Sequence, residues 1–315
     1  MQVIFGNENK TKLVNSLGVG LGNFDGLHTG HMTLINTLIE ETRRMGIDSV
    51  LYTFSKHPEH ILRKKLNTPL LTTINKKIEI LEKTSLDYIY FDKFDESFSR
   101  IRPEAFIKDI LVDKLNIKLA VTGFDYRFGY KGQGDVNMLE EAGKKFGFKV
   151  IIIPPVKIDG EIVSSTSIRH SIDKGNIEKA NNYLKRRYSI SGKVVKGRQI
   201  GNTIGFPTAN ILPLDYIVIP QKGVYITQTL FEGELFNSVT SIGMNPTFKD
   251  VSSISIETYL LDFNNDIYGK NIEVFFLKRI RKEKAFGSVE ELVKQIKDDV
   301  LFAREFFTQI ESRKI

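Results

Sequence analysis

Apolar runs and amphipathic stretches alternate along the first half of the chain. Short apolar runs typical of buried strands lie near residues 17–21, 50–54, 88–91, 119–121 and 150–153. Between them, apolar residues recur at helical spacing near residues 34–45, 74–81, 103–111 and 138–146. Strands that alternate with helices predict an α/β fold, in which helices cover a parallel sheet. Ligands of such sheets bind beyond the carboxyl ends of the strands.

The pattern changes after about Leu184. Short β-rich runs separated by turn residues follow at 190–195, 216–219, 224–230, 235–242, 254–261 and 272–277. They predict a small antiparallel barrel. Ser288, with Glu291 three residues later, predicts the start of a final helix, whose apolar face should pack on the barrel and runs from Val289 to Ile310. We therefore expect two domains, residues 1–184 and 185–315.

Composition and charge narrow the class of protein. The chain has 315 residues, of which 41% are hydrophobic and 26% charged, as in a globular protein with two cores. Its net charge of +7 suits anionic ligands. It has no cysteine, no apolar core of a signal peptide near its start and no apolar run of membrane-spanning length. We expect a soluble, cytoplasmic protein with no membrane partner.

The most informative stretch is GNFDGLHTGH, from Gly22 to His31, between a predicted strand and a predicted helix. Its glycines let backbone amides approach an anion, and a helix N-terminus favours phosphate. His28 and His31, three residues apart, can add donors, so the run predicts a site for the phosphates of ATP. Zinc is the alternative. It needs three or four ligands, and His57 could join the pair.

Three further segments follow predicted strands or begin a helix. Residues 54–58 (FSKHP) could form a wall of a nucleotide pocket. Residues 123–129 (GFDYRFG) could stack on a planar ring of a ligand and place an arginine near a phosphate. Residues 164–169 (SSTSIR) offer hydroxyl groups and an arginine for a triphosphate. Each segment also has an ordinary structural explanation. Residues 54–58 could be a strand-ending turn, and residues 123–129 a buried aromatic cluster with an ordinary Asp–Arg pair. Residues 164–169 could be plain helix capping.

The barrel half carries a second candidate site. The stretch GFPTAN, from Gly205 to Asn210, places a hydroxyl and an amide two residues apart, so that two oxygens could hold one Mg²⁺. Downstream, Glu257 stands in a predicted strand. Its neighbours in the sequence do not settle which face of the strand it occupies. An unremarkable turn and a solvent-facing glutamate are the alternatives.

Together these segments resemble bacterial FAD synthetases, which join an FMN adenylyltransferase half to a riboflavin kinase half. The resemblance covers nearly the whole chain after about Ser16. It implies a Rossmann-like nucleotidyltransferase domain with a parallel sheet, followed by a small antiparallel β-barrel riboflavin kinase domain with a C-terminal helix. It also implies that riboflavin is phosphorylated to FMN, and FMN adenylylated to FAD with release of pyrophosphate.

The resemblance implies residue roles in the first half. His28 and His31 would stabilise the transition state of adenylyl transfer. The implied ATP-binding residues are Gly22, Asn23, Phe24, Asp25, Gly30, Ser164, Ser165, Thr166 and Arg169. The implied flavin-binding residues are His57, Asp125, Arg127 and Phe128.

It implies roles in the second half as well. Glu257 would take the proton from the 5′-hydroxyl of riboflavin, and Thr208 and Asn210 would hold Mg²⁺. The implied nucleotide- and flavin-binding residues of the kinase are Gly197, Gly205, Pro207, Asn245, Arg281 and Phe286. Two positions depart from the family's pattern: Asn202 stands where arginine is usual, and Tyr259 where histidine is typical. Both departures could weaken the kinase.

The expected ligands are ATP, riboflavin, FMN, FAD and Mg²⁺, with no nucleic acid, and a homo-oligomer stays open. One alternative function is FMN adenylyltransferase alone, with a weak or silent kinase domain. A remoter one is a relative of class I aminoacyl-tRNA synthetases, which share the His-x-Gly-His motif. A third is a flavin- or RNA-binding regulator that has kept the fold and lost the chemistry.

Overall fold

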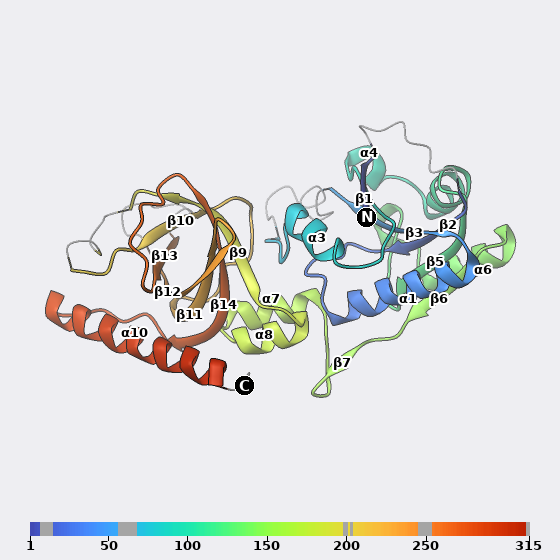
Figure 1. Cartoon of the computed structure of the whole chain (residues 1–315). Coiled ribbons are helices and arrows are strands. Elements are labelled where there is room, and N and C mark those ends of the chain that lie inside the picture. The colour runs from blue at the N-terminus through green and yellow to red at the C-terminus, as the bar shows by residue number, and fades with distance from the viewer. Residues whose placement is uncertain (7–14, 56–67, 198–200, 202–203, 245–253, 313–315) are drawn as a thin grey trace. The chain divides into compact units, whose positions relative to one another are not determined.

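The computed structural model describes residues 1–6, 15–55, 68–197, 201, 204–244 and 254–312. The chain divides into two compact units, Met1–Ser165 and Thr166–Ile315. Each unit is described by itself, with the element labels of Figure 1.

The first unit is built on a parallel sheet, as the alternating pattern predicts. Its strands lie in the order β1-β4-β3-β2-β5-β6, and every pair is parallel (Figure 1). The strands are β1 (Gln2–Phe5), β2 (Leu17–Leu21), β3 (Asp48–Phe54), β4 (Tyr88–Asp92), β5 (Ile117–Gly123) and β6 (Lys149–Ile153). The edge strand β1 is the one that the sequence analysis missed.

Helices cover both faces of this sheet. On one face, α1 (Thr29–Met45) and α3 (Ile74–Leu81) share an apolar core with β3, β4 and β5. On the other face, the π-helix η1 (Phe106–Lys114) and α6 (Val136–Phe146) pack in a second core that includes all of the apolar residues of β2. The short elements α4 (Glu96–Ser99), α5 (Pro103–Ala105) and η2 (Tyr130–Gly132) lie in the connections. A central strand such as β2 is therefore buried on both sides.

The predicted helix boundaries follow local chemistry. As expected, α1 ends at Gly46, which adopts the left-handed conformation with φ of 65°. The helix predicted to begin at Pro103 is instead a single turn, α5, that continues into η1. In η1 the amide of Leu115 donates to the carbonyl of Ile110 at 3.0 Å, a bond over five residues that marks the wider π turn.

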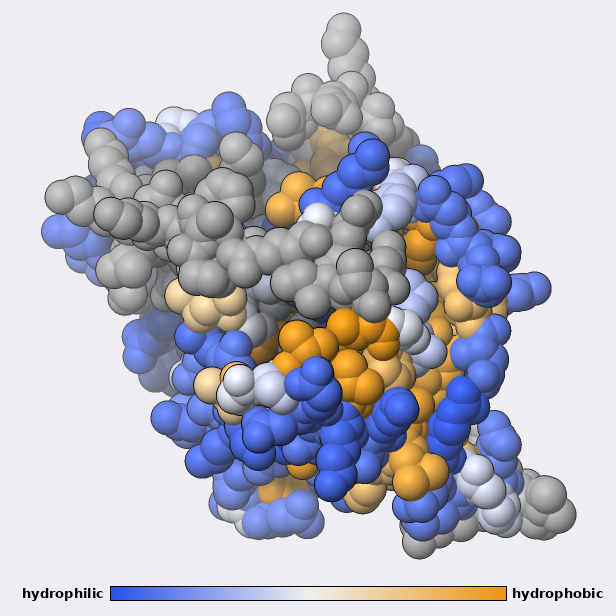
Figure 2. Space-filling view, turned by 90° about the vertical axis from the view of Figure 1, so that its left-hand side faces the viewer, coloured by the Kyte–Doolittle hydropathy of each residue, from blue (hydrophilic) through white to orange (hydrophobic). Residues whose placement is uncertain are grey.

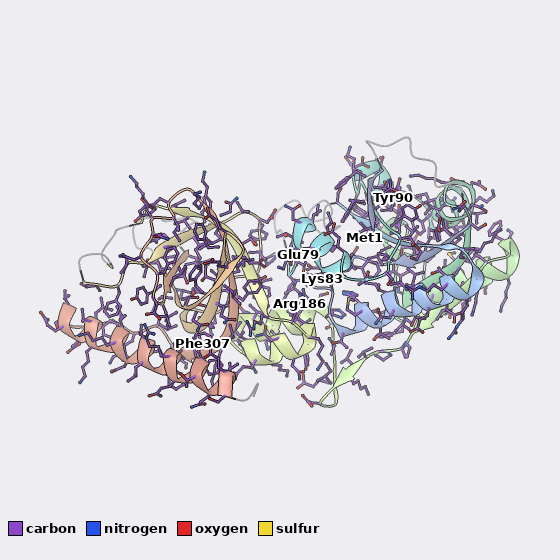
Figure 3. The ribbon with its side chains drawn as sticks, viewed as in Figure 1. Met1, Glu79, Lys83, Tyr90, Arg186 and Phe307 are labelled. Carbon is purple, nitrogen blue, oxygen red and sulfur yellow. The ribbon has the colours of Figure 1, made fainter. Side chains whose placement is uncertain are left out.

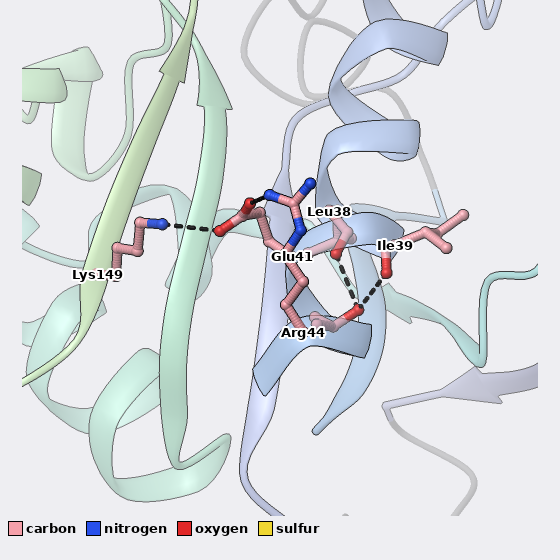
Figure 4. Close-up of polar contacts among 6 residues, drawn as sticks. Leu38, Ile39, Glu41, Arg44 and Lys149 are labelled. Atoms are coloured by element: carbon pink, nitrogen blue, oxygen red, sulfur yellow. Dashed lines mark hydrogen bonds and ion pairs between the residues drawn. The ribbon is translucent and has the colours of Figure 1, made fainter. Parts of the chain in front are cut away.

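A polar cluster ties α1 to the edge strand β6. Glu41 accepts a hydrogen bond from Lys149 at 2.7 Å and another from Arg44 at 2.6 Å (Figure 4). The hydrogen bond from Lys149 is the main cause that lowers the pKa of Glu41. On the same helix, the hydroxyl of Thr42 donates to the carbonyl of Leu38 at 2.8 Å. These contacts fix α1 along the sheet, and its N-terminus is fixed with it.

The second unit is a closed antiparallel barrel, as predicted. Its strands follow one another around the barrel as β10-β13-β12-β11-β14-β9. They are β9 (Tyr188–Val195), β10 (Ala209–Pro213), β11 (Gly223–Phe231), β12 (Glu234–Met244), β13 (Ile254–Leu260) and β14 (Asn271–Arg281). The helix α7 (Ser165–Asp173) begins at the last residue of the first unit, after the small hairpin β7 (Lys157–Ile158) and β8 (Glu161–Ile162).

One predicted strand is wrong. Residues 216–219 form no strand, and β10 takes the place in the barrel that the sequence analysis gave to them. Ile217 and Val218 are buried, which explains the apolar signal. The carbonyl of Val218, however, accepts a hydrogen bond from the Tyr188 hydroxyl at 2.5 Å rather than from a neighbouring strand. A loop whose apolar side chains are buried thus shows the same sequence pattern as a buried strand.

Two helices complete the barrel unit. The side chain of Asn181 on α8 (Ile177–Leu184) donates to the carbonyl of Phe276 at 2.9 Å, and its amide oxygen accepts from the Tyr188 amide at 2.7 Å. These bonds attach α8 to β14 and β9. In the structure α8 thus packs with the strands that follow it. The domain boundary predicted near residue 184 stays a prediction.

The final helix, α10 (Val289–Ser312), begins after Ser288 as predicted, with a variant of the capping box in which the return bond comes from the residue before the cap. The Ser288 hydroxyl accepts from the Glu291 amide at 3.3 Å, and the Glu291 carboxylate accepts from the Gly287 amide at 3.0 Å. Phe307 lies on the side of α10 that faces the barrel, where it packs with the barrel's outer apolar residues (Figure 3). Val289 is 56% exposed, so the predicted apolar face does not reach the first residue of the helix.

The surface of the barrel unit is not uniformly polar. Figure 2 shows apolar groups among charged ones on the face turned toward the viewer. Exposed apolar side chains of this unit include Leu212, Leu214, Leu235, Leu301 and Phe302. Among the described residues, no helix is both long enough and apolar enough to cross a membrane.

Candidate functional site

The order of the strands reverses beside β2. The chain runs from β2 to β3 on one side, whereas β5 lies on the other side of β2. In a parallel sheet, ligands bind at such a reversal of strand order, beyond the carboxyl ends of the strands. Gly22 directly follows β2, and Gly123 ends β5. The two predicted glycine segments of the first unit therefore meet at one edge of the sheet.

The loop after β2 has an unusual backbone. Phe24, Gly26 and Leu27 all have positive φ angles, of 49°, 90° and 41°. Such angles are unfavourable for a residue other than glycine. Both Phe24 and Leu27 have no exposed surface, so the surrounding core holds them in this conformation. The loop turns the chain sharply from β2 into the start of α1.

His28 and His31 stack on each other at that start. Their ring centroids are 3.7 Å apart, and the planes differ by 17°. His28 is the N-cap of α1: its Nδ1 accepts a hydrogen bond from the His31 amide at 3.3 Å. Because Nδ1 accepts, the proton of a neutral His28 ring lies on Nε2. A side chain on Gly30 would come within 3.2 Å of the His28 ring, so glycine at this position gives the imidazole the space that it occupies.

Hydrogen bonds from other parts of the first unit hold Asn23 and Asp25 in place. The carbonyl of Asn23 accepts from the Thr53 hydroxyl at 3.1 Å and from the Lys77 ammonium at 3.0 Å. The Asp25 carboxylate, which is 3% exposed, accepts from the amides of Leu71 at 3.0 Å and Thr72 at 3.1 Å. The side chain of Asn23 is exposed, whereas that of Asp25 faces the protein.

Lys77 is a residue that the sequence analysis missed. It is 6% exposed, and burial lowers the pKa of its ammonium to about 8, against the opposing effect of Asp25. A signal was present, because Lys77 lies three residues after Ile74 and four before Leu81, on the apolar face of α3. A charged residue at an apolar position of a helix will be buried, so it needs hydrogen-bond or charge partners in the surrounding protein.

The serine-rich segment begins α7 as predicted. The Ser165 hydroxyl donates to the main-chain carbonyl of Asp25 at 2.8 Å, which joins this segment to the loop after β2. Ser164 precedes the helix, Thr166 lies in its first turn and Arg169 one turn later. Thr166 is exposed, and Ser164 and Arg169 are partly buried.

The aromatic loop after β5 divides into exposed and buried members. Phe124 is 45% exposed, and Asp125 is exposed beside it. Phe128 is 6% exposed and packs against the ring of Phe106 at 5.4 Å, within the core. Arg127 is exposed, and its ion pair is with Asp135 at 3.4 Å rather than with Asp125. His57 lies outside the described residues.

The second candidate site forms where β10 and β13 pair. Asn210 lies opposite Glu257 in the register of these strands. The Thr208 hydroxyl donates to Glu257 Oε2 at 3.5 Å, and the Ser255 hydroxyl donates to Oε1 at 2.7 Å. Along β13 the burial alternates, and Thr258 next to Glu257 is fully buried. Glu257 therefore lies on the outer face of the barrel, which the sequence could not decide.

The neighbouring glycines fit around this group. A side chain on Gly197 would come within 2.2 Å of Asn210 Nδ2, so only glycine lets the amide side chain occupy its position. Gly205 has a φ of 82°, which favours glycine, and Pro207 is exposed next to Thr208. Asn202 and Asn245 lie outside the described residues. The ring of Tyr259 packs edge-on against Phe206 at 5.5 Å.

Arg281 lies at the end of β14 and is already engaged. Its guanidinium donates to both oxygens of Asp299 on α10, at 2.9 Å and 2.8 Å. It also lies over the ring of Phe286, 5.8 Å from its centroid. Arg281 and Phe286 are thus brought together, and Asp299 on α10 holds the Arg281 guanidinium there.

A pocket of about 260 Å³ adjoins Thr208 and was not predicted from the sequence. It is lined by Pro207, Thr208, Ala209 and the loop after β13. Residues of that loop at the pocket are Phe263, Asn264, Asn265, Asp266, Ile267 and Tyr268. Among the residues that the structure describes, no group of three or more histidine, aspartate or glutamate side chains could hold a metal ion.

Comparison with known proteins identifies the family. The FAD synthetase family model matches residues 10–167, and the riboflavin kinase family model matches residues 184–307. A bifunctional riboflavin kinase/FMN adenylyltransferase of Buchnera aphidicola (subsp. Schizaphis graminum) is 38% identical over 313 residues, which cover 98% of this chain and 100% of that protein. The chain belongs to the bifunctional riboflavin kinase/FMN adenylyltransferase family. The Escherichia coli (strain K12) protein of the same name is 38% identical and covers 91% of each chain.

Both halves of the family are thus present in one chain. The protein is an enzyme with two activities, riboflavin kinase and FMN adenylyltransferase, and this function is favoured over the alternatives raised from the sequence. A crystal structure described as a macrolide-efflux protein from Streptococcus pneumoniae superposes with a TM-score of 0.86 at 31% identity, over 96% of this chain and 99% of that one. That description does not carry over to this chain, whose sequence matches both enzyme families.

Proposed function

We propose that the two reactions take place at two separate sites, adenylyl transfer at the loop after β2 and phosphoryl transfer where β10 pairs with β13. The observation that carries the first assignment is the pair of stacked histidines at the N-terminus of α1, at the reversal of strand order. The second rests on the meeting of Thr208, Asn210 and Glu257 on the outer face of the barrel.

At the first site, the ATP phosphates lie against the start of α1. The amides of the first helical turn and the Nε2 proton of His28 face developing negative charge there, with His31 stacked behind. Gly22 leaves room for the Phe24 ring and Gly30 for the His28 ring, Asn23 and Phe24 shape the loop that receives the phosphates, and Asp25 fixes it by its amide contacts. Ser164, Ser165, Thr166 and Arg169 hold the outer phosphates.

The reaction at this site needs no covalent bond to the enzyme. An oxygen of the FMN phosphate attacks the α-phosphorus of ATP, the bond to the β-phosphate oxygen breaks, and pyrophosphate leaves. Positioning and charge stabilisation by His28 and His31 supply the catalysis. We place the flavin ring against the loop after β5, with Asp125, Arg127 and Phe128, and with His57. The exposed ring of Phe124 adds a stacking surface.

At the second site, Glu257 is the general base. It takes the proton from the 5′-hydroxyl of riboflavin, and the resulting oxygen attacks the γ-phosphorus of ATP, so that ADP leaves. The Ser255 hydroxyl donates to one carboxylate oxygen and fixes the rotamer of Glu257. The other oxygen, near Thr208, is the one that faces the reacting groups. Tyr259 lies beside Phe206 and outside these contacts.

The residues at this second site fit Mg²⁺. Thr208 and Asn210 supply neutral oxygens next to a carboxylate, the hard donors that this ion prefers. A bound Mg²⁺ would neutralise charge on the phosphates of ATP. The neighbouring pocket is of a size for the nucleoside, with Gly197, Gly205 and Pro207 at its approach. Arg281, Phe286 and Asn245 would bind on the flavin and nucleotide side.

The setting of the enzyme follows from its substrates. ATP and free flavins are small cytoplasmic molecules, so we place the enzyme in the cytoplasm. Its partners are nucleotides and flavins rather than nucleic acid, and a homo-oligomer is compatible with both sites. The boundary between the domains falls near residue 184, after α8.

The test separates the two reactions. The full-length protein is incubated with ATP and Mg²⁺ and with either riboflavin or FMN, and the flavins are separated. His28→Ala with His31→Ala should abolish formation of FAD from FMN and spare formation of FMN. Glu257→Gln should do the reverse, by a factor of about 10² to 10⁴. Glu234→Gln, at an exposed residue of β12, is the control. An unchanged FAD yield in the histidine variant, or an unchanged FMN yield in Glu257→Gln, removes that assignment.

A further inference from the structure

The buried ammonium of Lys77 has no part in the chemistry described so far. Lysine is among the residues least often buried, because desolvating its charge is costly. Here the side chain leaves the apolar face of α3 and ends under the loop after β2. Its Nζ donates to the main-chain carbonyl of Asn23 at 3.0 Å. The free-energy cost of burying a charge is tolerated where that charge serves a functional site.

The Asn23 carbonyl is held by two donors. The Thr53 hydroxyl, fully buried on β3, supplies the second bond at 3.1 Å. A carbonyl oxygen has two lone pairs, so these two donors fix the plane of the peptide between Asn23 and Phe24. Phe24 is the first of the residues with positive φ. The orientation of this peptide therefore determines how the strained turn begins.

Asp25 supplies the matching negative charge. Its buried carboxylate accepts two main-chain amides from residues 71 and 72, and its charge favours the protonated form of Lys77. On α3 itself, the neighbouring Lys76 pairs with Glu79 at 2.8 Å. Among the residues that the structure describes, Asp25 is the charged group whose effect on the pKa of Lys77 is resolved, and the two residues hold both ends of the turn from Asn23 to Asp25.

We propose that Lys77 is a positioning residue for adenylyl transfer. Its ammonium holds the Asn23 carbonyl and so keeps the loop from Gly22 to His28 in the conformation that receives the ATP phosphates. This inference rests on the proposed placement of ATP at that loop. Lys77 touches no substrate in this arrangement. It acts through the backbone, and its positive charge beneath the loop adds to the attraction for the phosphates.

A purely structural role would have a different outcome. If Lys77 served only to stabilise the fold, its replacement by methionine would lower the melting temperature, because the Asn23 carbonyl would lose a donor and the buried Asp25 carboxylate a nearby positive charge. The activity of the folded variant would then be kept. A positioning role predicts a folded variant that has lost adenylyl transfer. The two roles therefore separate in a comparison of melting temperature with rate.

The first experiment compares Lys77→Met with Lys76→Met in the full-length protein. For Lys77→Met, we expect kcat/KM for ATP in FAD formation to fall by a factor of about 10 to 100, the worth of a hydrogen bond from a charged donor. Formation of FMN from riboflavin, at the other site, should stay within about twofold. Lys76→Met should leave both reactions unchanged. A folded Lys77→Met protein that keeps its FAD-forming rate overturns the proposal.

The second experiment needs no substitution of Lys77. Burial places the pKa of Lys77 at about 8, so FAD formation by the unaltered protein should decline from about pH 7 to about pH 9 as this ammonium loses its proton. The decline should be absent in Lys77→Met. A flat profile in the unaltered protein, or the same decline in the variant, overturns the proposal. Where Lys77→Met does not fold, Thr53→Val decides instead: an unchanged rate of FAD formation overturns the proposal.

The histidine variant separates this inference from the placement of ATP. If His28→Ala with His31→Ala keeps FAD formation, the site itself is misplaced. If that variant is inactive and Lys77→Met is fully active, the site stands and the role of Lys77 does not.

Discussion

Asp25 lies in the loop where we propose that the phosphates of ATP bind. A carboxylate there would repel the phosphates unless the protein compensated its charge, and the protein does so. Two main-chain amides and the positive charge of Lys77 surround it, and it is 3% exposed. The sequence predicts that Asp25 belongs to the nucleotide loop. It cannot show that the carboxylate turns inward, because the partners Leu71 and Thr72 lie 46 and 47 residues away. Partners distant in sequence leave no local pattern.

The burial of Lys77 also makes stability depend on pH. Its folded pKa of about 8 is lower than the value of about 10.4 in an unfolded chain. Between these values the unfolded chain binds a proton that the folded chain does not, so stability rises with pH there. At neutral pH the difference costs about 3 kcal/mol.

We therefore expect the stability of Lys77→Met, relative to that of the unaltered protein, to be higher at about pH 7 than at about pH 10. Hydrogen exchange of the β2 and β3 amides, followed by mass spectrometry, measures the stability of that unit by itself. Lys76→Met, on the same helix and paired with Glu79, is the control. A stability difference between Lys77→Met and the unaltered protein that is the same at both pH values contradicts the assignment of the low pKa to Lys77.

At the scale of elements, periodic segments are predictable and short or irregular ones are not. The helix α1 and the strands β11 to β14 were predicted because each has a long apolar pattern. The edge strand β1 has four residues of mixed burial, which is too short for a pattern. The strand β10 begins after Pro207 and Thr208, residues typical of a turn, whereas the buried loop at 216–219 imitates a strand. Burial alone does not distinguish a strand from a packed loop.

The attachment of α10 offers a test with an internal control. Two arginine–aspartate pairs with two hydrogen bonds or more join this helix to the barrel. Asp299 pairs with Arg281 and is 4% exposed, whereas Asp262 pairs with Arg304 and its side chain is 73% exposed. Removing one partner of a buried pair leaves an uncompensated charge and costs about 3 kcal/mol or more. An exposed pair is screened by water.

Asp299→Ala should therefore lower the free energy of unfolding of the barrel unit by about 3 kcal/mol, and Asp262→Ala should have a much smaller effect. Urea unfolding followed by far-UV circular dichroism measures both. Formation of FMN should also weaken in Asp299→Ala, because Arg281 and Phe286 lose their support from α10. Equal losses of stability in the two variants would contradict the difference in burial as the cause.

At the scale of the whole molecule, each unit contains its own core and the central residues of one candidate site. The parallel sheet has its own apolar cores and the loop after β2, and the closed barrel has Thr208, Asn210 and Glu257. The sequence predicts two domains because periodicity and motifs change together near Leu184. It does not predict the pocket beside Thr208, since the loop at 263–268 that lines it carries no motif singled out in advance.

Two separate sites predict that inactive variants can complement each other. The His28→Ala/His31→Ala protein should make FMN from riboflavin but no FAD, and Glu257→Gln should make FAD only from added FMN. A mixture of the two proteins, given riboflavin, ATP and Mg²⁺, should form FAD after a lag, because FMN released by one protein must accumulate before the other uses it. The lag should shorten as the amount of the kinase-competent protein rises. If the mixture forms no FAD although added FMN is converted at the usual rate, then FMN does not leave the kinase site freely, and the two sites do not act independently.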